Sequence, residues 1–139
     1  MDRDTLVQFV RARGLAVLAT TAADGSPQAA VVGVAATADG DIVFDTTRGS
    51  RKLANLTREP RVALVIGSDW DDERTVQLEG TAAEIPADDP AVAAYYQQFP
   101  SGLERADWPE IVYVRVRPRW ARYSDYRPDT FGMQEIPLA

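Results

Sequence analysis

The sequence lacks cysteine and histidine altogether, and it contains a single lysine, Lys52. Without these residues the chain has no disulfide, no thiolate metal site and neither the commonest general base nor the commonest metal ligand. Nucleophilic schemes built on cysteine or on a serine–histidine pair are therefore excluded. Metal sites made only of carboxylates remain open, and the acidic loop 69–73 around Trp70 is the place to look for one. Because that loop has no EF-hand spacing, we expect a solvated hairpin loop without a metal.

Long apolar runs and positive net charge are also missing. The longest apolar run, 29–36, is far shorter than the roughly 20 residues of a membrane helix, and the first residues lack the apolar core of a signal peptide. A formal net charge of -6 and a pI near 4.6 indicate repulsion from nucleic acid and from anionic membranes. We therefore expect a cytoplasmic protein that binds neither. Its 139 residues predict a single domain, 1–139, with a complete hydrophobic core.

What the sequence does contain is a series of short segments with strand character, separated by turn residues. The six segments with β-branched, aromatic or alternating composition are 15–21, 28–37, 41–46, 61–67, 74–85 and 111–117. Three short helices are predicted between and before them, the first capped by Asp4 and ended by Gly14, the second following Ser50, and the third starting at 88–90. Strands in hairpin order with helices at the ends fit a closed or nearly closed antiparallel barrel.

Two of these strands have informative side-chain patterns. The segment 28–37 has little polar alternation, which predicts a strand covered on both faces, and its small residues would let a flat ligand approach the backbone. We therefore count Val31 and Val32 as candidate cofactor contacts, with tight sheet or dimer packing as the alternative. In the segment 111–117, alternation predicts that the valines face the core and that Tyr113 faces outward.

The stretch 44–66 places a strand end, a turn and a helix start around two adjacent cations, Arg51 and Lys52. A helix start offers unpaired backbone N–H groups and the positive end of the helix dipole. The arginine fork and the lysine point charge suit a phosphoester better than a carboxylate. Hydroxyl donors are available from Thr46, Thr47 and Ser50. The alternative is a solvated basic first turn, which the helix dipole disfavours.

The sequence DTTRGSRKLANLTREPRVAL, residues 45–64, resembles the signature of the pyridoxamine 5'-phosphate oxidase-like, FMN-binding split-barrel family. The likeness extends more weakly from Gly14 to about Tyr126. It implies a mainly β fold with short helices, a six-stranded antiparallel split β-barrel. It also implies a homodimer with two flavins lodged between the subunits.

The resemblance assigns roles to residues as well. The family's threonine, arginine and lysine that hold the FMN phosphate correspond to Thr46, Arg51 and Lys52, with Thr47 and Ser50 as close neighbours. A family glutamine that reaches the flavin ring falls at Thr75, and Gln77 lies on the same strand face as a substitute. That strand would approach the cofactor of the partner subunit.

The chain also departs from the name-giving oxidase. Two cations of the second strand correspond to Ala30 and about Ala35, and the terminal substrate segment is replaced by RYSDYRPDTF, residues 122–131. We therefore expect an FMN-dependent oxidoreductase that transfers hydride through flavin N5 to or from an unidentified small molecule. The alternatives are a reductase using the deazaflavin F420 and a flavin-binding or sensing module without turnover. The sequence identifies no catalytic residue, and we expect positioning to dominate.

Overall fold

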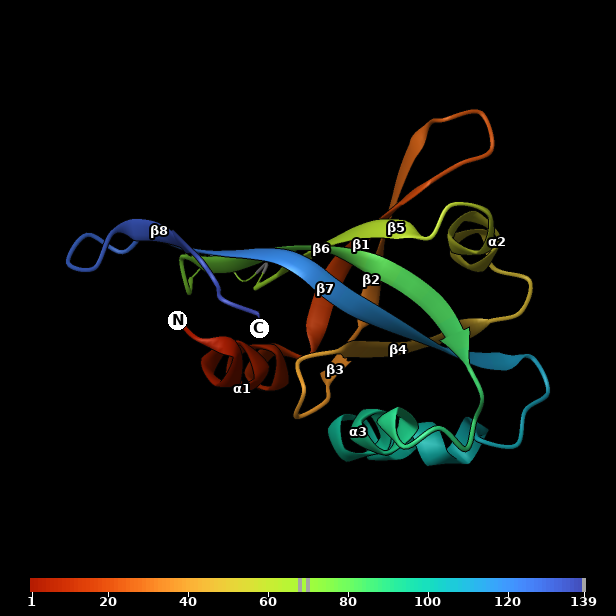
Figure 1. Cartoon of the computed structure of the whole chain (residues 1–139). Helices are drawn as coiled ribbons and strands as arrows, with labels where there is room; N and C mark the ends of the chain where they lie inside the picture. The colour runs from red at the N-terminus through yellow and green to blue at the C-terminus, as the bar shows by residue number, and fades with distance from the viewer. Residues whose placement is uncertain (68, 70, 139) are drawn as a thin grey trace.

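The computed structural model describes residues 1–67, 69 and 71–138 as a strongly curved antiparallel sheet with short helices around it (Figure 1). The helical elements are α1 (Arg3–Arg13), α2 (Arg51–Arg58), α3 (Ala91–Gln98) and the 3-10 helix η1 (Pro100–Arg105). The strands are β1 (Leu15–Thr21), β2 (Pro27–Gly33), β3 (Ala35–Ala36), β4 (Ile42–Thr47), β5 (Arg61–Ile66), β6 (Arg74–Ile85), β7 (Ile111–Asp125) and β8 (Gly132–Glu135). Their order is β2-β1-β5-β6-β7-β4-β3, and β8 pairs with β7. The mainly β, antiparallel class expected from the sequence is confirmed.

The sheet has eight strands in the described residues, whereas the sequence predicted six. The segment 28–37, expected as one strand, is broken at Val34 into β2 and β3. The Val34 N–H donates to the Gly14 carbonyl at 3.0 Å, so the chain changes partner at this point: β2 pairs with β1, and β3 pairs with β4. Strand β8 was not expected, because its sequence GMQE has no β-branched residue.

Strand β7 is longer than predicted and runs past Pro118 to Asp125. Pro118 lies opposite Gly80, where the register between β6 and β7 shifts. A Cβ at Gly80 would lie 2.5 Å from the Arg117 carbonyl oxygen, so only glycine permits this close approach. The irregularity accommodates a residue without an N–H, and the strand continues beyond it.

The first two helices begin at side-chain caps. The Asp2 carboxylate caps α1 by accepting from the Thr5 N–H at 2.8 Å, whereas Asp4, the predicted cap, lies in the first turn. Asp2 takes this role because its backbone is extended, as an N-cap requires. The helix ends at Gly14, with φ 65°, and Ser50 caps α2, both as predicted.

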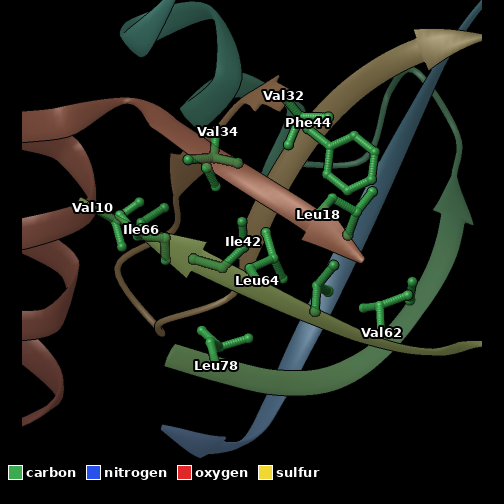
Figure 2. Close-up of a cluster of buried hydrophobic side chains, with 14 of the residues drawn as sticks. Val10, Leu18, Val32, Val34, Ile42, Phe44, Val62, Leu64, Ile66 and Leu78 are labelled. Carbon is green, nitrogen blue, oxygen red and sulfur yellow. The ribbon is translucent and has the colours of Figure 1, made fainter. Parts of the chain in front are cut away.

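The inner face of the sheet carries the main hydrophobic core (Figure 2). Helix α1 and several strands contribute side chains to it, among them Val10, Leu18, Val32, Phe44, Leu64 and Leu78, each at most 6% exposed. Figure 2 places Val32 near Phe44, so the inner face of β2 closes over β4. Packing around Phe44 fixes strand β4, which leads directly into the loop before α2.

A second, smaller cluster lies between α3 and the strands β4 and β7. Tyr113 was expected to face outward into solvent, but it is only 2% exposed because Tyr95 and Tyr96 of α3 pack around it. Its hydroxyl hydrogen-bonds that of Tyr96, and burial raises the pKa of the Tyr113 phenol. The alternation of β7 was interpreted correctly, but a helix covers its other face.

One face of the β2-β1-β5 region carries apolar side chains that the rest of the described chain leaves uncovered. Val31 is 65% exposed, Leu15 45% and Val65 37%. The register places Val31 opposite Val17 and Val17 opposite Val65, which makes an apolar row across three strands. The segment 28–37 was expected to be covered on both faces. Within one chain this holds for β3, whose two alanines are both buried and which packs against α3, but on β2 the outer face is exposed at Val31.

The acidic loop between β5 and β6 joins two paired strands, as predicted for a hairpin loop. Asp72 pairs with Arg13 and, at 2.5 Å, with Arg74 Nε, and Trp70 lies outside the described residues. No group of three or more acidic side chains in the described part of the chain is arranged to hold a metal ion. Over the same residues, no helix is long and apolar enough to cross a membrane.

Candidate functional site

The loop between β4 and α2 forms a corner that is tied together by hydroxyl groups. The Thr46 hydroxyl donates to Ser50 Oγ at 2.9 Å, and Ser50 Oγ accepts from the Leu53 N–H at 3.2 Å. The Ser50 N–H in turn donates to the Thr47 carbonyl at 3.0 Å. Thr46 is buried and Thr47 is exposed. Ser50 therefore fixes the start of α2 against the end of β4, and this places Arg51 and Lys52 in the first helical turn.

Arg51 and Lys52 are two cations whose charge the described residues leave uncompensated. Arg51 is exposed, Lys52 is half-buried, and neither has a described acidic side chain within ion-pair distance. Arg48 of the same loop behaves differently, because it pairs with Glu84 at 2.8 Å, and this hydrogen bond raises the Arg48 pKa. Within the β4–α2 loop and the first turn of α2, the positive charge that no described acidic residue pairs is therefore that of Arg51 and Lys52.

A pocket of about 280 Å³ opens beside these two cations. It is lined by Leu18, Thr20, Gln28, Ala29, Ala30, Arg51 and Lys52, so it lies between β1, β2 and the first turn of α2. None of these lining residues is acidic. Its polar groups and the dipole of α2 favour an anion.

The buried amide that holds two of the lining residues was not predicted from the sequence. Asn55, 6% exposed, donates its amide to Thr20 Oγ1 at 3.1 Å and to Gln28 Oε1 at 2.6 Å. Its own Oδ1 accepts from Arg58 at 3.2 Å. The signal available in the sequence was Asn55 itself, an amide side chain next to Leu56 in the predicted helix. Amides are too common on helices for this position to stand out from the sequence alone.

The other predicted contacts lie outside this pocket in the single chain. Val31 is exposed on the outer face of β2, and Val32 is buried in the core. Thr75 pairs with Ser124 on the adjacent strand, and Gln77 accepts a hydrogen bond from Arg122 at 3.2 Å. The corner residues are thus brought together, while these four are not.

A larger hollow of about 620 Å³ lies beside α3. Its charged lining consists of Arg11, Asp39, Asp41, Asp89, Arg115 and Arg117. Here the charges compensate one another: Arg115 Nη1 lies 3.3 Å from Asp89, and both Arg115 and Arg117 lie within 4 Å of Asp41. Three arginines and three aspartates line this hollow, so its formal charges cancel, although Arg11 and Asp39 belong to none of these ion pairs.

A phosphate fits the corner by the chemistry of its donors. Two cations and the N-terminal end of α2 lie there, and the hydrogen-bonded hydroxyl groups of Thr46 and Ser50 hold that helix end in place. Such groups are the usual protein partners of a phosphate monoester. The carboxylates that would repel one are absent from the lining residues of the pocket.

Known proteins match the chain both in sequence and in structure. Residues 3–125 match the family model described as pyridoxamine 5'-phosphate oxidase. A pyridoxine/pyridoxamine 5'-phosphate oxidase from Salinibacter ruber is 36% identical over 92 residues, which cover 66% of this chain and 41% of that protein. The chain therefore spans less than half the length of this curated relative.

Two solved structures show the same fold. A heme binding protein from Mycobacterium smegmatis superposes with a TM-score of 0.80 at 20% identity, over 99% of this chain and 59% of that one. A conserved hypothetical protein from Mycobacterium tuberculosis superposes with a TM-score of 0.73 at 27% identity, over 91% and 86%. With 3–125 matched by the family model and this fold shared, the chain belongs to the pyridoxamine 5'-phosphate oxidase-like split-barrel family.

Proposed function

We propose that the chain binds FMN by its phosphate at the β4–α2 corner and acts as an FMN-dependent oxidoreductase on a small molecule. The observation that carries this proposal is the pair of uncompensated cations, Arg51 and Lys52, at a capped helix start beside a pocket without acidic residues. Family membership supports a flavin as the bearer of the phosphate. When bound, FMN supplies hydride or electron transfer at N5 of its ring.

The chain's own residues then bind and orient. Arg51 offers a two-pronged contact and Lys52 a point charge, while Thr46, Thr47 and Ser50 belong to the hydroxyl-rich loop around the phosphate. The residues Arg51 and Lys52 each supply charge-assisted hydrogen bonds, worth about 1.5–3 kcal/mol apiece. With no histidine or cysteine in the chain, catalysis rests on positioning rather than on a dedicated nucleophile.

A homodimer is part of the proposal. The apolar row of Val31, Val17 and Val65 ends beside Gln77 on β6, a polar residue that pairs with Val65. A second copy covering this row would therefore lie against Gln77, and Thr75 is on the same strand two residues away. This arrangement supports a role for Thr75, Gln77 and Val31 at a cofactor held between subunits, whereas Val32 faces the core on the other side of β2.

The haem of the Mycobacterium smegmatis protein is not part of the proposal. This chain has no histidine and no cysteine, which are common protein ligands of haem iron. The unpaired cations of the corner instead suit a phosphate, and because the whole chain carries a net charge of -6, this local positive site is where an anion would be attracted.

The test is the mass and absorption spectrum of the small molecule that co-purifies with the protein, followed by titration of the stripped protein with FMN and with riboflavin. We expect FMN to bind and riboflavin, which lacks the phosphate, to bind far more weakly. A deazaflavin mass would replace FMN by F420 at the same corner. Bound FMN that no nicotinamide or artificial donor reduces would leave a flavin-binding module and overturn the oxidoreductase proposal.

A further inference from the structure

The amide network beneath the pocket determines which atoms of its wall face the ligand. Asn55 is buried and donates to two acceptors at once, Thr20 Oγ1 and Gln28 Oε1, at 3.1 and 2.6 Å. Both acceptors belong to residues that line the pocket beside Arg51. The acceptor atoms of this part of the wall are thus turned toward Asn55.

Consequently, the atoms left to face the ligand are donors. A carboxamide has one acceptor oxygen and one NH2 group, so Gln28, whose oxygen is taken by Asn55, keeps two N–H donors. Thr20, whose oxygen also accepts from Asn55, keeps its hydroxyl proton. Thr20 and Gln28 can therefore donate to an anion from the strands, and the two cations can donate to it from α2.

We propose that Gln28 is a further phosphate-binding residue of this site and that Asn55 is the positioning residue that turns its NH2 group toward the ligand. The inference rests on the proposed function, since it names a donor for the same phosphate. It places a neutral donor on β2, opposite the cations of α2. Gln28 and Ala30 lie on the same face of that strand and both line the pocket. Ala30 has no polar side-chain group, so Gln28 is the one of the two that can donate a hydrogen bond.

The hydrogen-bond geometry of Asn55 explains why an asparagine is required there. Its oxygen is held by Arg58 at 3.2 Å, which leaves the NH2 group as the only part that can face β1 and β2. An aspartate of the same shape has no N–H, so Gln28 would have to turn and donate to it. The Gln28 oxygen, an acceptor, would then face the ligand, and a negative charge would lie behind it.

The first experiment measures the dissociation constants of FMN and riboflavin, by quenching of flavin fluorescence, for Gln28→Ala and Gln28→Glu. We expect Gln28→Ala to weaken FMN about threefold to tenfold, the value of one neutral hydrogen bond, with riboflavin unchanged. Gln28→Glu should weaken FMN about thirtyfold or more, because a carboxylate would face the phosphate. Gln97→Ala, in the hollow beside α3, is the matched control and should leave both constants unchanged.

The second experiment compares Asn55→Asp with the natural protein in the ratio of FMN to riboflavin affinity, with thermal unfolding measured alongside. A purely structural role would lower both affinities together, whereas a positioning role lowers the FMN affinity alone. If both Gln28 variants bind FMN as the natural protein does, the inference is overturned. Loss of FMN affinity in Arg51→Ala in that case shows that the proposed function survives, while unchanged binding there too shows that the phosphate site itself was wrong.

Discussion

The corner pocket and the hollow beside α3 differ in size and in charge, and the smaller of the two is the better candidate for an anion site. The hollow beside α3 measures about 620 Å³ and the corner pocket about 280 Å³. In the larger hollow Arg115 already binds Asp89 and lies near Asp41, so an incoming anion would have to displace a carboxylate. At the corner, no described carboxylate competes for Arg51 or Lys52. The corner pocket is therefore proposed as the binding site because of its unpaired positive charge and not because of its volume.

The largest expected effect comes from removing the uncompensated charge. Arg51→Ala and Lys52→Ala should each weaken FMN binding about tenfold to a hundredfold, and the double variant about a hundredfold to ten-thousandfold, through lost charge-assisted hydrogen bonds. Both side chains lie outside the core, so thermal unfolding should not change. Flavin fluorescence titration measures the effect, and riboflavin serves as the control ligand. Equal losses for FMN and riboflavin would mean that the corner is only structural.

A second substitution tests whether one chain makes the whole site. Val31→Asp places a charge in the uncovered apolar row and should raise the dissociation constant of a homodimer about a hundredfold or more, because an unpaired charge would be buried. Sedimentation velocity at micromolar concentration should show a dimer for the natural protein and a monomer for the variant. Val31→Ile is the conservative control. A natural protein that sediments as a monomer contradicts the dimer.

Asp125 is a carboxylate whose charge is already paired, and its contribution to stability can be tested. It is 4% exposed. Its carboxylate accepts from Arg127 at 2.8 Å and from Thr130 at 2.8 Å, and these bonds hold the pKa of Asp125 well below its usual range. A depressed pKa contributes stability above the unfolded-state value near 4, and that stability is lost as the pH falls. Asp125→Asn should therefore lower the melting temperature by several degrees at pH 7 and by much less at pH 2. An equal decrease at both pH values would show that charge is not the cause.

The smallest effect is expected in the larger hollow. Arg115→Ala should leave FMN affinity within about twofold of the natural value, because this arginine is occupied by Asp89. The free energy of unfolding should fall by only about 0.5–1 kcal/mol, as measured by urea denaturation, since the pair is partly solvated. A large loss of FMN affinity in this variant would reverse the comparison between the two hollows.

Much of the fold could be predicted because its signals are local. The Ser50 cap, the end of α2 before Pro60 and the alternation of β6 depend on near neighbours in sequence, and the structure has all three. The break at Val34 and the extension of β7 depend instead on distant partners, Gly14 and Gly80. The residues next to Val34 or Pro118 in the sequence do not indicate which distant residue will pair with them.

The same distinction applies to the candidate site. Arg51 and Lys52 are adjacent cations at a helix start, and a motif of adjacent residues can be recognised from the sequence. Thr20, Gln28 and Asn55 meet only because β1, β2 and α2 pack together. The cover of Val31 is undetermined by the sequence for a related reason: an apolar strand has the same composition whether a helix of its own chain or a second copy covers it.

The pairing of β4 has a consequence for the order in which the site can form during synthesis. Strand β4 has only a two-residue ladder with β3, and its long ladder joins it to β7, from Thr47 opposite Ile111 to Ile42 opposite Val116. A ribosome-bound chain whose β7 segment has not yet left the ribosome therefore lacks the strand pairing that holds Thr46 next to Ser50. Such long-range pairing closes slowly. The proposed phosphate corner is therefore complete only in chains whose β7 segment has already been synthesised.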